Sequence, residues 1–288
     1  MKKVLGIVLM LVLSMALFAC GETPNASASA SAGASASASP SSQANVGVDF
    51  DGEFTTEANS EEAVQMFSDL ETQNADIFND QNNEVGDMGW NGYKFSMVTA
   101  ITSGSVTTSV TASGKMIFKQ DGSFDKGEFL GNVGGMFNAV YNMYIADNCL
   151  YMNYGSYKLK YRTDDEEAWQ SFSSIKGDEI LNSLKNLLAE KETLTESGVK
   201  IYIDEDAAET RIKFDMTEVS GIAAAGYSSY YMVVVLDESD NVIGMQLVIE
   251  LDGQNNKQKM TYEIAPYSGT ITLPDLTGYT DMTNAGDE

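Results

Sequence analysis

Few side chains in this sequence could do chemistry. The 288-residue chain has no histidine, only two cysteines, and 42 aspartates and glutamates. The lack of histidine excludes Ser-His-Asp and Cys-His catalysis, histidine-ligated zinc and the commonest general base near neutral pH. Because Cys20 and Cys149 are far apart in sequence, they form no C-x-x-C redox motif. The glycine-rich phosphate-binding motifs and the G-x-S-x-G nucleophile motif are also missing.

The acidic residues leave two weaker options. A carboxylate pair could hydrolyse glycosides, but among 42 acids no pair is singled out. Two clusters suggest calcium loops: Asp80, Asn82 and Glu84; and Asp121, Ser123 and Asp125. Both lack the EF-hand turn glycine, because Val85 and Lys126 stand at that position. We interpret them as solvated turns, and predict a protein that is not an enzyme and has no metal and no cofactor.

Cys20 is the residue whose surroundings best predict its chemistry. Two lysines precede an apolar run at residues 4–18, which is short for a membrane-spanning helix of roughly 20 residues. The run ends in LFAC, which resembles the bacterial lipobox. The resemblance implies that residues 1–19 are a signal peptide and that Cys20 carries a diacylglyceryl anchor. The alternatives are an ordinary signal peptide cut after Ala19 and an uncleaved anchor.

The next segment separates this signal from the first patterned region. Residues 25–45 are mostly alanine and serine, with no aromatic or charged side chain, so we expect a disordered tether that starts at Cys20. As a flexible coil it would reach roughly 25–30 Å. The net charge of −25 disfavours nucleic acid and anionic lipid headgroups as partners. The lipid on Cys20 would therefore hold a domain at 46–288 on the extracytoplasmic face of the cell membrane.

The elements of that domain follow from its hydrophobic periodicity. Residues 60–80 and 177–196 have apolar residues at helical spacing, and the first segment begins with a capping sequence, Asn59-Ser60-Glu61-Glu62. Alternating apolar and polar residues predict strands at 93–101, 115–119, 141–145, 157–162, 211–216, 243–251 and 259–264. Residues 231–236 are apolar on both faces, which predicts a central strand, and 271–276 reads as a closing edge piece stopped by Pro274.

Together these elements predict an α+β fold. About ten antiparallel strands should form one large curved sheet, a half-barrel, with two main helices packed across its concave face. The order of lipobox, polar linker, helix, meander, helix and meander resembles the LolA/LppX-like half-barrel lipoproteins, which include an uncharacterised Gram-positive branch. The resemblance implies that the concave face holds an acyl chain. No single motif carries it, and the conserved arginine of the lipoprotein carriers has no counterpart.

Methionines and aromatic residues recur on the apolar phase of the strands. Methionine is flexible and polarizable and suits promiscuous apolar surfaces, so we identify these residues as candidates for lining a ligand cavity. The candidates are Phe95, Met97, Met116, Phe118, Met143, Met152, Phe214, Met216, Met245 and Met260. The alternative is that they only fill a core between sheet and helices. Cys149 reads as a small core residue, with a reactive or lipidated thiol as the alternative.

Three functions remain open. The first is a membrane-anchored lipoprotein that binds a lipid or another hydrophobic ligand on the concave face. The second is a non-enzymatic surface interaction or scaffold lipoprotein with a filled core; an exposed cluster of Tyr227, Tyr230 and Tyr231 would favour it. The third is an envelope sensor. A ligand cavity of several hundred Å³ would favour the first.

Overall fold

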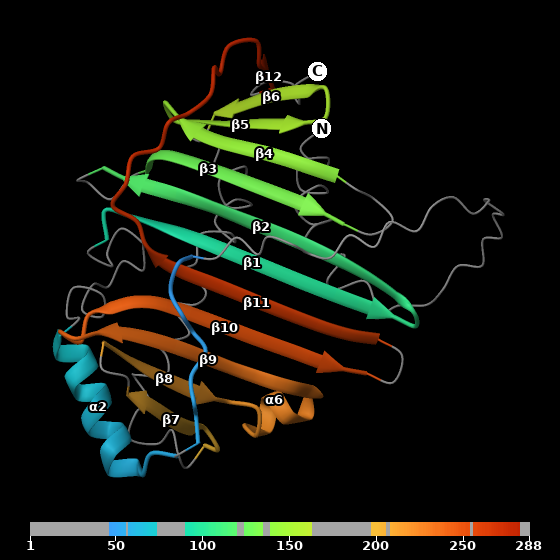
Figure 1. Cartoon of the computed structure of the whole chain (residues 1–288). Coiled ribbons are helices and arrows are strands. Elements are labelled where there is room, and N and C mark those ends of the chain that lie inside the picture. Colours follow the sequence, from blue (N-terminus) through green and yellow to red (C-terminus); the bar gives the residue numbers. More distant parts are fainter. Residues whose placement is uncertain are drawn as a thin grey trace.

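One twelve-stranded sheet organises the chain (Figure 1). The computed structural model describes residues 46–55, 57–73, 90–119, 124–134, 139–162, 197–205, 208–253 and 256–282. The first run of strands is β1 (Gly92–Ser103), β2 (Val106–Phe118), β3 (Phe124–Val133), β4 (Ala139–Ala146), β5 (Cys149–Tyr154) and β6 (Tyr157–Arg162). The second run is β7 (Lys200–Glu205), β8 (Glu209–Asp215), β9 (Tyr227–Asp237), β10 (Val242–Asp252) and β11 (Asn256–Pro266), followed by β12 (Thr280–Asp281).

The two runs are antiparallel meanders that meet in the middle of the sheet. The strand order is β12-β6-β5-β4-β3-β2-β1-β11-β10-β9-β8-β7, so β1 starts at the centre and β11 returns to it. Their antiparallel pairing extends from Tyr93 opposite Pro266 to Ser103 opposite Asn256. Only β12 is parallel to its neighbour, β6. The large open antiparallel sheet expected from the sequence is confirmed, and a half-barrel description fits it.

The two main helices expected across the concave face are not seen in the described segments, which contain the smaller α2 (Ser60–Gln73) and the short α6 (Ser220–Ala224). The start of α2 is as predicted. The Asn59 side chain accepts hydrogen bonds from the backbone N–H groups of Glu61 and Glu62, at 3.1 and 3.0 Å, and Glu62 accepts one from the Asn59 N–H. This reciprocal capping box satisfies donors that the first helical turn leaves unpaired. The second predicted helix, 177–196, lies outside the described residues.

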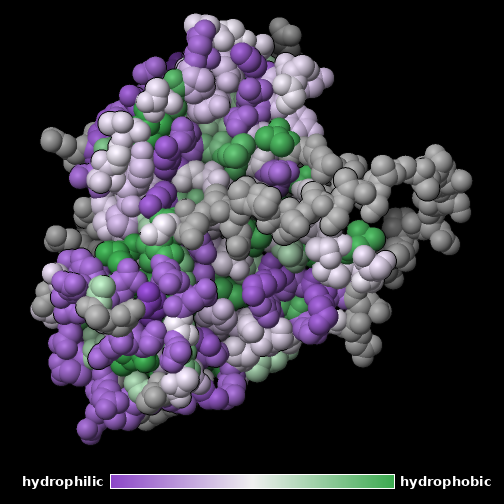
Figure 2. Space-filling model, viewed as in Figure 1, coloured by the Kyte–Doolittle hydropathy of each residue, from purple (hydrophilic) through white to green (hydrophobic). Residues whose placement is uncertain are grey.

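The sheet has one apolar face and one mixed face. Residues directly opposite on neighbouring antiparallel strands share a face. Phe95, Ile264, Met245 and Val234 thus form a row across β1, β11, β10 and β9, and all four are buried. Leu70 of α2 packs in the same cluster, so this is the face that we call concave. The opposite face, which we call the outer face, is mostly hydrophilic with apolar patches (Figure 2).

A segment that the sequence did not predict crosses the outer face. Residues 46–55, which we call the strap, run in front of β11, β10 and β9 (Figure 1). Val46 and Phe50 of the strap pack on Val233, Val235 and Ala265. This contact explains why β9 is apolar on both sides: its concave residues face the main core, and its outer residues face the strap. The central position predicted for 231–236 is confirmed, since β9 lies between β8 and β10.

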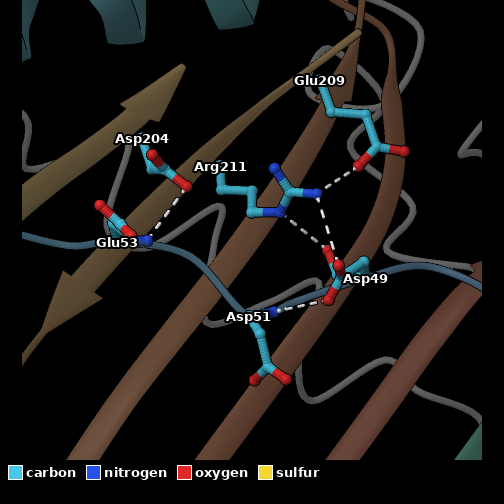
Figure 3. Close-up of polar contacts among 6 residues, drawn as sticks. All are labelled: Asp49, Asp51, Glu53, Asp204, Glu209 and Arg211. Atoms are coloured by element: carbon cyan, nitrogen blue, oxygen red, sulfur yellow. Dashed lines mark hydrogen bonds and ion pairs between the residues drawn. The ribbon is translucent and has the colours of Figure 1, made fainter. Parts of the chain in front are cut away.

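Arg211 on β8 holds the strap in place (Figure 3). Although it is only 6% exposed, its Nε donates to the Asp49 carbonyl at 3.0 Å and its Nη2 to Glu209 at 2.7 Å. Further along, the Glu53 N–H donates to the Asp204 carboxylate at 3.2 Å. The chain then bends around the sheet edge, where Glu57 bridges to Tyr202 of β7. A strand edge that would otherwise be open to pairing is thereby covered.

The C-terminal segment covers the outer face at the other end of the sheet. Leu273, Leu276 and Tyr279 pack on a small cluster that contains Cys149 and Tyr151. The prediction of an edge strand at 271–276 was wrong, because this segment forms no strand and β12 is the edge. Buried apolar contacts, not backbone pairing, hold residues 271–276 to the sheet.

We expect Arg211→Met to lower the free energy of unfolding by about 1–3 kcal/mol, because the strap carbonyl and Glu209 lose a buried charged donor. The matched control is Lys257→Met, which removes an exposed ion pair with Asp252 and should cost less than about 1 kcal/mol. Urea denaturation measures both. Equal effects of the two variants would show that Arg211 does not anchor the strap.

Candidate functional site

The centre of the concave face is lined by packed aromatic rings. The Phe95 ring lies 5.7 Å from that of Phe129 and 6.1 Å from that of Tyr262, measured between centroids. Tyr93 stacks on Phe118 at 5.8 Å. These contacts join β1, β2, β3 and β11 into one surface, and spacings of this size are typical of favourable aromatic pairs.

Glycines on the same face make room for these rings. Gly114 lies opposite Phe95 and Phe129, and Gly131 lies opposite Tyr141. A methyl group at Gly131 would collide with the Tyr141 ring, and one at Gly114 would meet Phe129. This explains why the sequence did not reveal β3: glycines occupy positions where the alternating pattern calls for apolar side chains.

All ten predicted lining residues belong to this concave surface. Eight belong to the main apolar cluster or pack against it: Phe95, Met116, Phe118, Met143, Met152, Phe214, Met216 and Met245. Met97 and Met260 lie on the same face by register, opposite Tyr262 and Thr99 respectively. The shared face is therefore established, whereas contact with a ligand stays a prediction. Cys20 lies outside the described residues.

On the concave face, the side chains become less buried from one end of the central strands to the other. The row that contains Phe95 and Met245 is fully buried at the end of the sheet where α2 packs (Figure 1). Two and six residues further along β1 from Phe95, Met97 and Ile101 are only half-buried, as are Met260 and Ile249 on the neighbouring strands. We call the first region the closed end and the second the open end. An apolar ligand could contact protein at the open end without displacing the buried core.

Thr99 is a polar exception at the open end. It is 5% exposed and points to the concave face, opposite Met260 and Val110. Within the described part of the chain, its hydroxyl has no hydrogen-bond partner. A buried hydroxyl without a partner is costly and calls for an explanation. The polar group of an amphiphile would supply one. The sequence held one sign of this site: a threonine stands where the alternation in β1 calls for an apolar residue.

Described residues of the outer face line at least two pockets. The larger, about 570 Å³, lies beside the strap on β1, β9, β10 and β11, and we call it the outer pocket. The smaller, about 350 Å³, lies on β1 to β4 around an ion pair between Lys115 and Glu128 at 2.8 Å. Sequence analysis found neither pocket, because each depends on strands or segments that are distant in the chain.

Glu263 on β11 is a half-buried acid of the outer pocket. Burial raises its pKa above the ordinary value, although hydrogen bonds from Gln246 and from the Val46 N–H oppose the shift. The Gln246 amide donates to the carboxylate at 3.1 Å. The folded environment therefore disfavours the charged form of this carboxyl group.

The structure also decides several smaller expectations. Cys149 is a buried free thiol, as the core interpretation predicted. The exposed tyrosine cluster that would favour a surface interaction protein is not formed by these three residues: Tyr227 and Tyr230 are in edge-to-face contact on the concave side, whereas Tyr231 packs under the strap on the outer side. Tyr230 and Tyr231 are separated because successive side chains of a strand point to opposite faces of the sheet. Of the acidic clusters, only Asp125 lies within the described residues.

Two further searches of the described segments gave no site. No group of three or more acidic or cysteine side chains there is arranged to hold a metal ion. Nor is any helix in those segments both long and apolar enough to span a membrane.

Comparisons with known proteins give weak structural likeness only. No protein-family model matches the sequence, and no curated protein matches it. A DUF1329 family protein from Desulfovibrio piger is 10% identical with a TM-score of 0.24, over 73% of this chain and 95% of that one. A putative outer membrane lipoprotein-sorting protein domain from Vibrio parahaemolyticus is 7% identical with a TM-score of 0.22, over 76% and 97%.

A β-barrel-like protein of the DUF1849 family from Brucella abortus is 7% identical with a TM-score of 0.17, over 62% of this chain and all of that one. TM-scores this low transfer neither a ligand nor a function to this chain. Membership of a Gram-positive branch and lipidation stay predictions.

We expect Glu263→Gln to raise stability at neutral pH. The raised pKa means that the folded state holds the proton more tightly than the unfolded state does. The wild-type protein should lose stability as pH rises from the unfolded value, near 4.5, through the higher folded pKa. Urea titrations from pH 4 to 7 should show this loss in the wild type and a flatter profile in the variant. Glu238→Gln, in the β9–β10 turn, is the charge-matched control. If the stability of Glu263→Gln depended on pH in the same way as that of the wild type, Glu263 would not be the group responsible for the loss.

Proposed function

We propose that this chain is a lipid-anchored envelope protein that binds a lipid or another amphiphile on the concave face of its sheet. The observation that carries the proposal is the open end, where Met97, Met260 and Ile249 stay half-buried beside a fully buried core. Flexible methionine side chains adapt to acyl chains of different length. The signal-like N terminus and LFAC motif support an anchor at Cys20 and an extracytoplasmic location.

The ligand that suits this site is amphiphilic. Its chain would lie against the half-buried apolar residues, and its polar group would reach Thr99, whose buried hydroxyl offers a donor and two acceptor positions. A pure hydrocarbon would leave this hydroxyl unsatisfied. No catalytic group accompanies the site in the described residues, so the proposed role is binding and not conversion.

A filled-core interaction protein is the second candidate. Leu130 and Val140 favour it, because they are about half exposed on the outer face of β3 and β4. Two residues make a small patch, and apolar side chains scattered over a surface are common. The concave surface is the larger apolar feature, so we place the function there.

Native mass spectrometry of residues 46–288 tests ligand binding. We expect a bound species of lipid mass that solvent extraction removes and that envelope lipid extract restores. Met97→Glu should abolish the bound species, because it places a charge at the open end. Ala100→Glu is the matched control, since residue 100 lies on the same strand and faces the outer side. An apo mass before and after exposure to lipid extract would contradict ligand binding.

Fractionation of cells that express the full chain tests the anchor. We expect Cys20→Ser to move the protein from the membrane fraction to the soluble extracytoplasmic fraction and to abolish labelling by a fatty-acid analogue. Cys149→Ser is the matched control and should leave both unchanged, because Cys149 is buried in the domain. Membrane retention of the Cys20→Ser protein would show that another feature holds the chain there.

A further inference from the structure

The outer pocket combines a polar floor with an apolar centre. Neighbouring strands place Ser96 directly opposite Glu263, and Glu263 opposite Gln246. Two residues further along each strand, and so on the same face, Val98, Thr261 and Val248 form a second row. The strap forms one wall, from which Asp51 lines the pocket. At about 570 Å³ the pocket is within the size range of small-molecule sites.

The charges around this pocket do not balance. The nearby cations have partners of their own: Lys259 pairs with Glu250 at 2.7 Å, and Arg211 binds Glu209 and the strap backbone. Within the described residues, no cation forms an ion pair with Asp51 or Glu263. The Asp51 carboxylate points away from Arg211 (Figure 3), and its charge contributes to the raised pKa of Glu263. Two carboxylates thus share the pocket without a counter-ion.

The Ser96 hydroxyl is an independent indication that the pocket lacks a hydrogen-bonding partner. It is 96% buried on the outer face, and in the part of the chain that the structure describes its hydroxyl makes no hydrogen bond. Buried hydroxyl groups are nearly always paired. This hydroxyl lines the pocket beside Glu263, so a ligand that enters the pocket is the partner that the geometry offers.

We propose that the outer pocket binds a primary ammonium group carried on a short alkyl chain. An ammonium has three donors and no acceptor, and the pocket presents three groups that can accept them: the carboxylate of Asp51, the hydroxyl of Ser96, and the carboxylate of Glu263, which has acceptor capacity beyond its bonds from Gln246 and Val46. The alkyl chain would lie on Val98 and Val248. This site is separate from the concave face, on the opposite side of the sheet, and does not depend on the function proposed there.

The free amine of a small molecule and the side chain of a lysine share this chemistry. Isothermal titration calorimetry of the full chain in a non-ionic detergent would use two probes, pentylamine and Nα-acetyl-lysine methylamide. Binding of both means that the pocket accepts a lysine side chain; binding of pentylamine alone means that it accepts only free amines. Either result supports the site. Pentan-1-ol has the same chain without the charge and should not bind.

The variants identify the acceptors. We expect Asp51→Asn and Glu263→Gln each to weaken pentylamine binding by roughly 10-fold or more, and Ser96→Ala by a few-fold, as for hydrogen bonds to a charged group. Glu238→Gln removes the same charge from a distant turn and reports the general attraction of a chain with net charge −25. Affinity that Asp51→Asn and Glu263→Gln leave unchanged, or equal binding of pentan-1-ol by the wild-type chain, would overturn the proposal.

Discussion

The pairing of β1 with β11 is the constraint on which the rest of the structure depends. It joins two meanders that are each local in sequence into one sheet, through eleven consecutive residue pairs. Because opposite residues share a face, the same register places the methionines and rings of both halves on the concave side. A slip of one residue would turn one half over and expose its apolar face. The concave surface and the outer pocket both span this seam.

The local parts of the fold could be predicted from the sequence. The alternation in 93–101 and 243–251 predicted strands, and Asn59 with Glu62 predicted the start of α2, because these signals lie within a few residues of each other. The β1–β11 pairing connects residues more than 150 positions apart, and no periodicity carries that information. β3 escaped prediction because Gly127 and Gly131 replace apolar alternates, and their role appears only when the rings of other strands cover them.

The candidate sites also divide into features that a local sequence pattern reveals and features that depend on distant parts of the chain. The ten concave candidates were found because a repeating pattern reveals which face a residue occupies. It does not reveal how deeply each is buried, so Met116 and Met97 looked alike although only Met116 is fully buried. Arg211 occupies a polar position that alternation assigns to solvent. It is buried because the strap lies over it, and the short alternation of Val46, Val48 and Phe50 in the strap does not reveal which strands the strap covers.

The strap joins the predicted tether to the outer face of the sheet, and the chain continues from the strap to α2 on the concave face. If Cys20 is anchored, the tether joins the domain at Val46, which is buried against the outer face. The Val46 N–H also donates to Glu263, so the N-terminal residue of the strap touches the outer pocket. Occupation of that pocket by a cation would neutralise Glu263 and Asp51, and Asp51 belongs to the strap. If both proposals hold, the outer face combines attachment and recognition, whereas the concave face combines core and ligand surface. A sheet with a filled closed end would then keep two separate surfaces for binding.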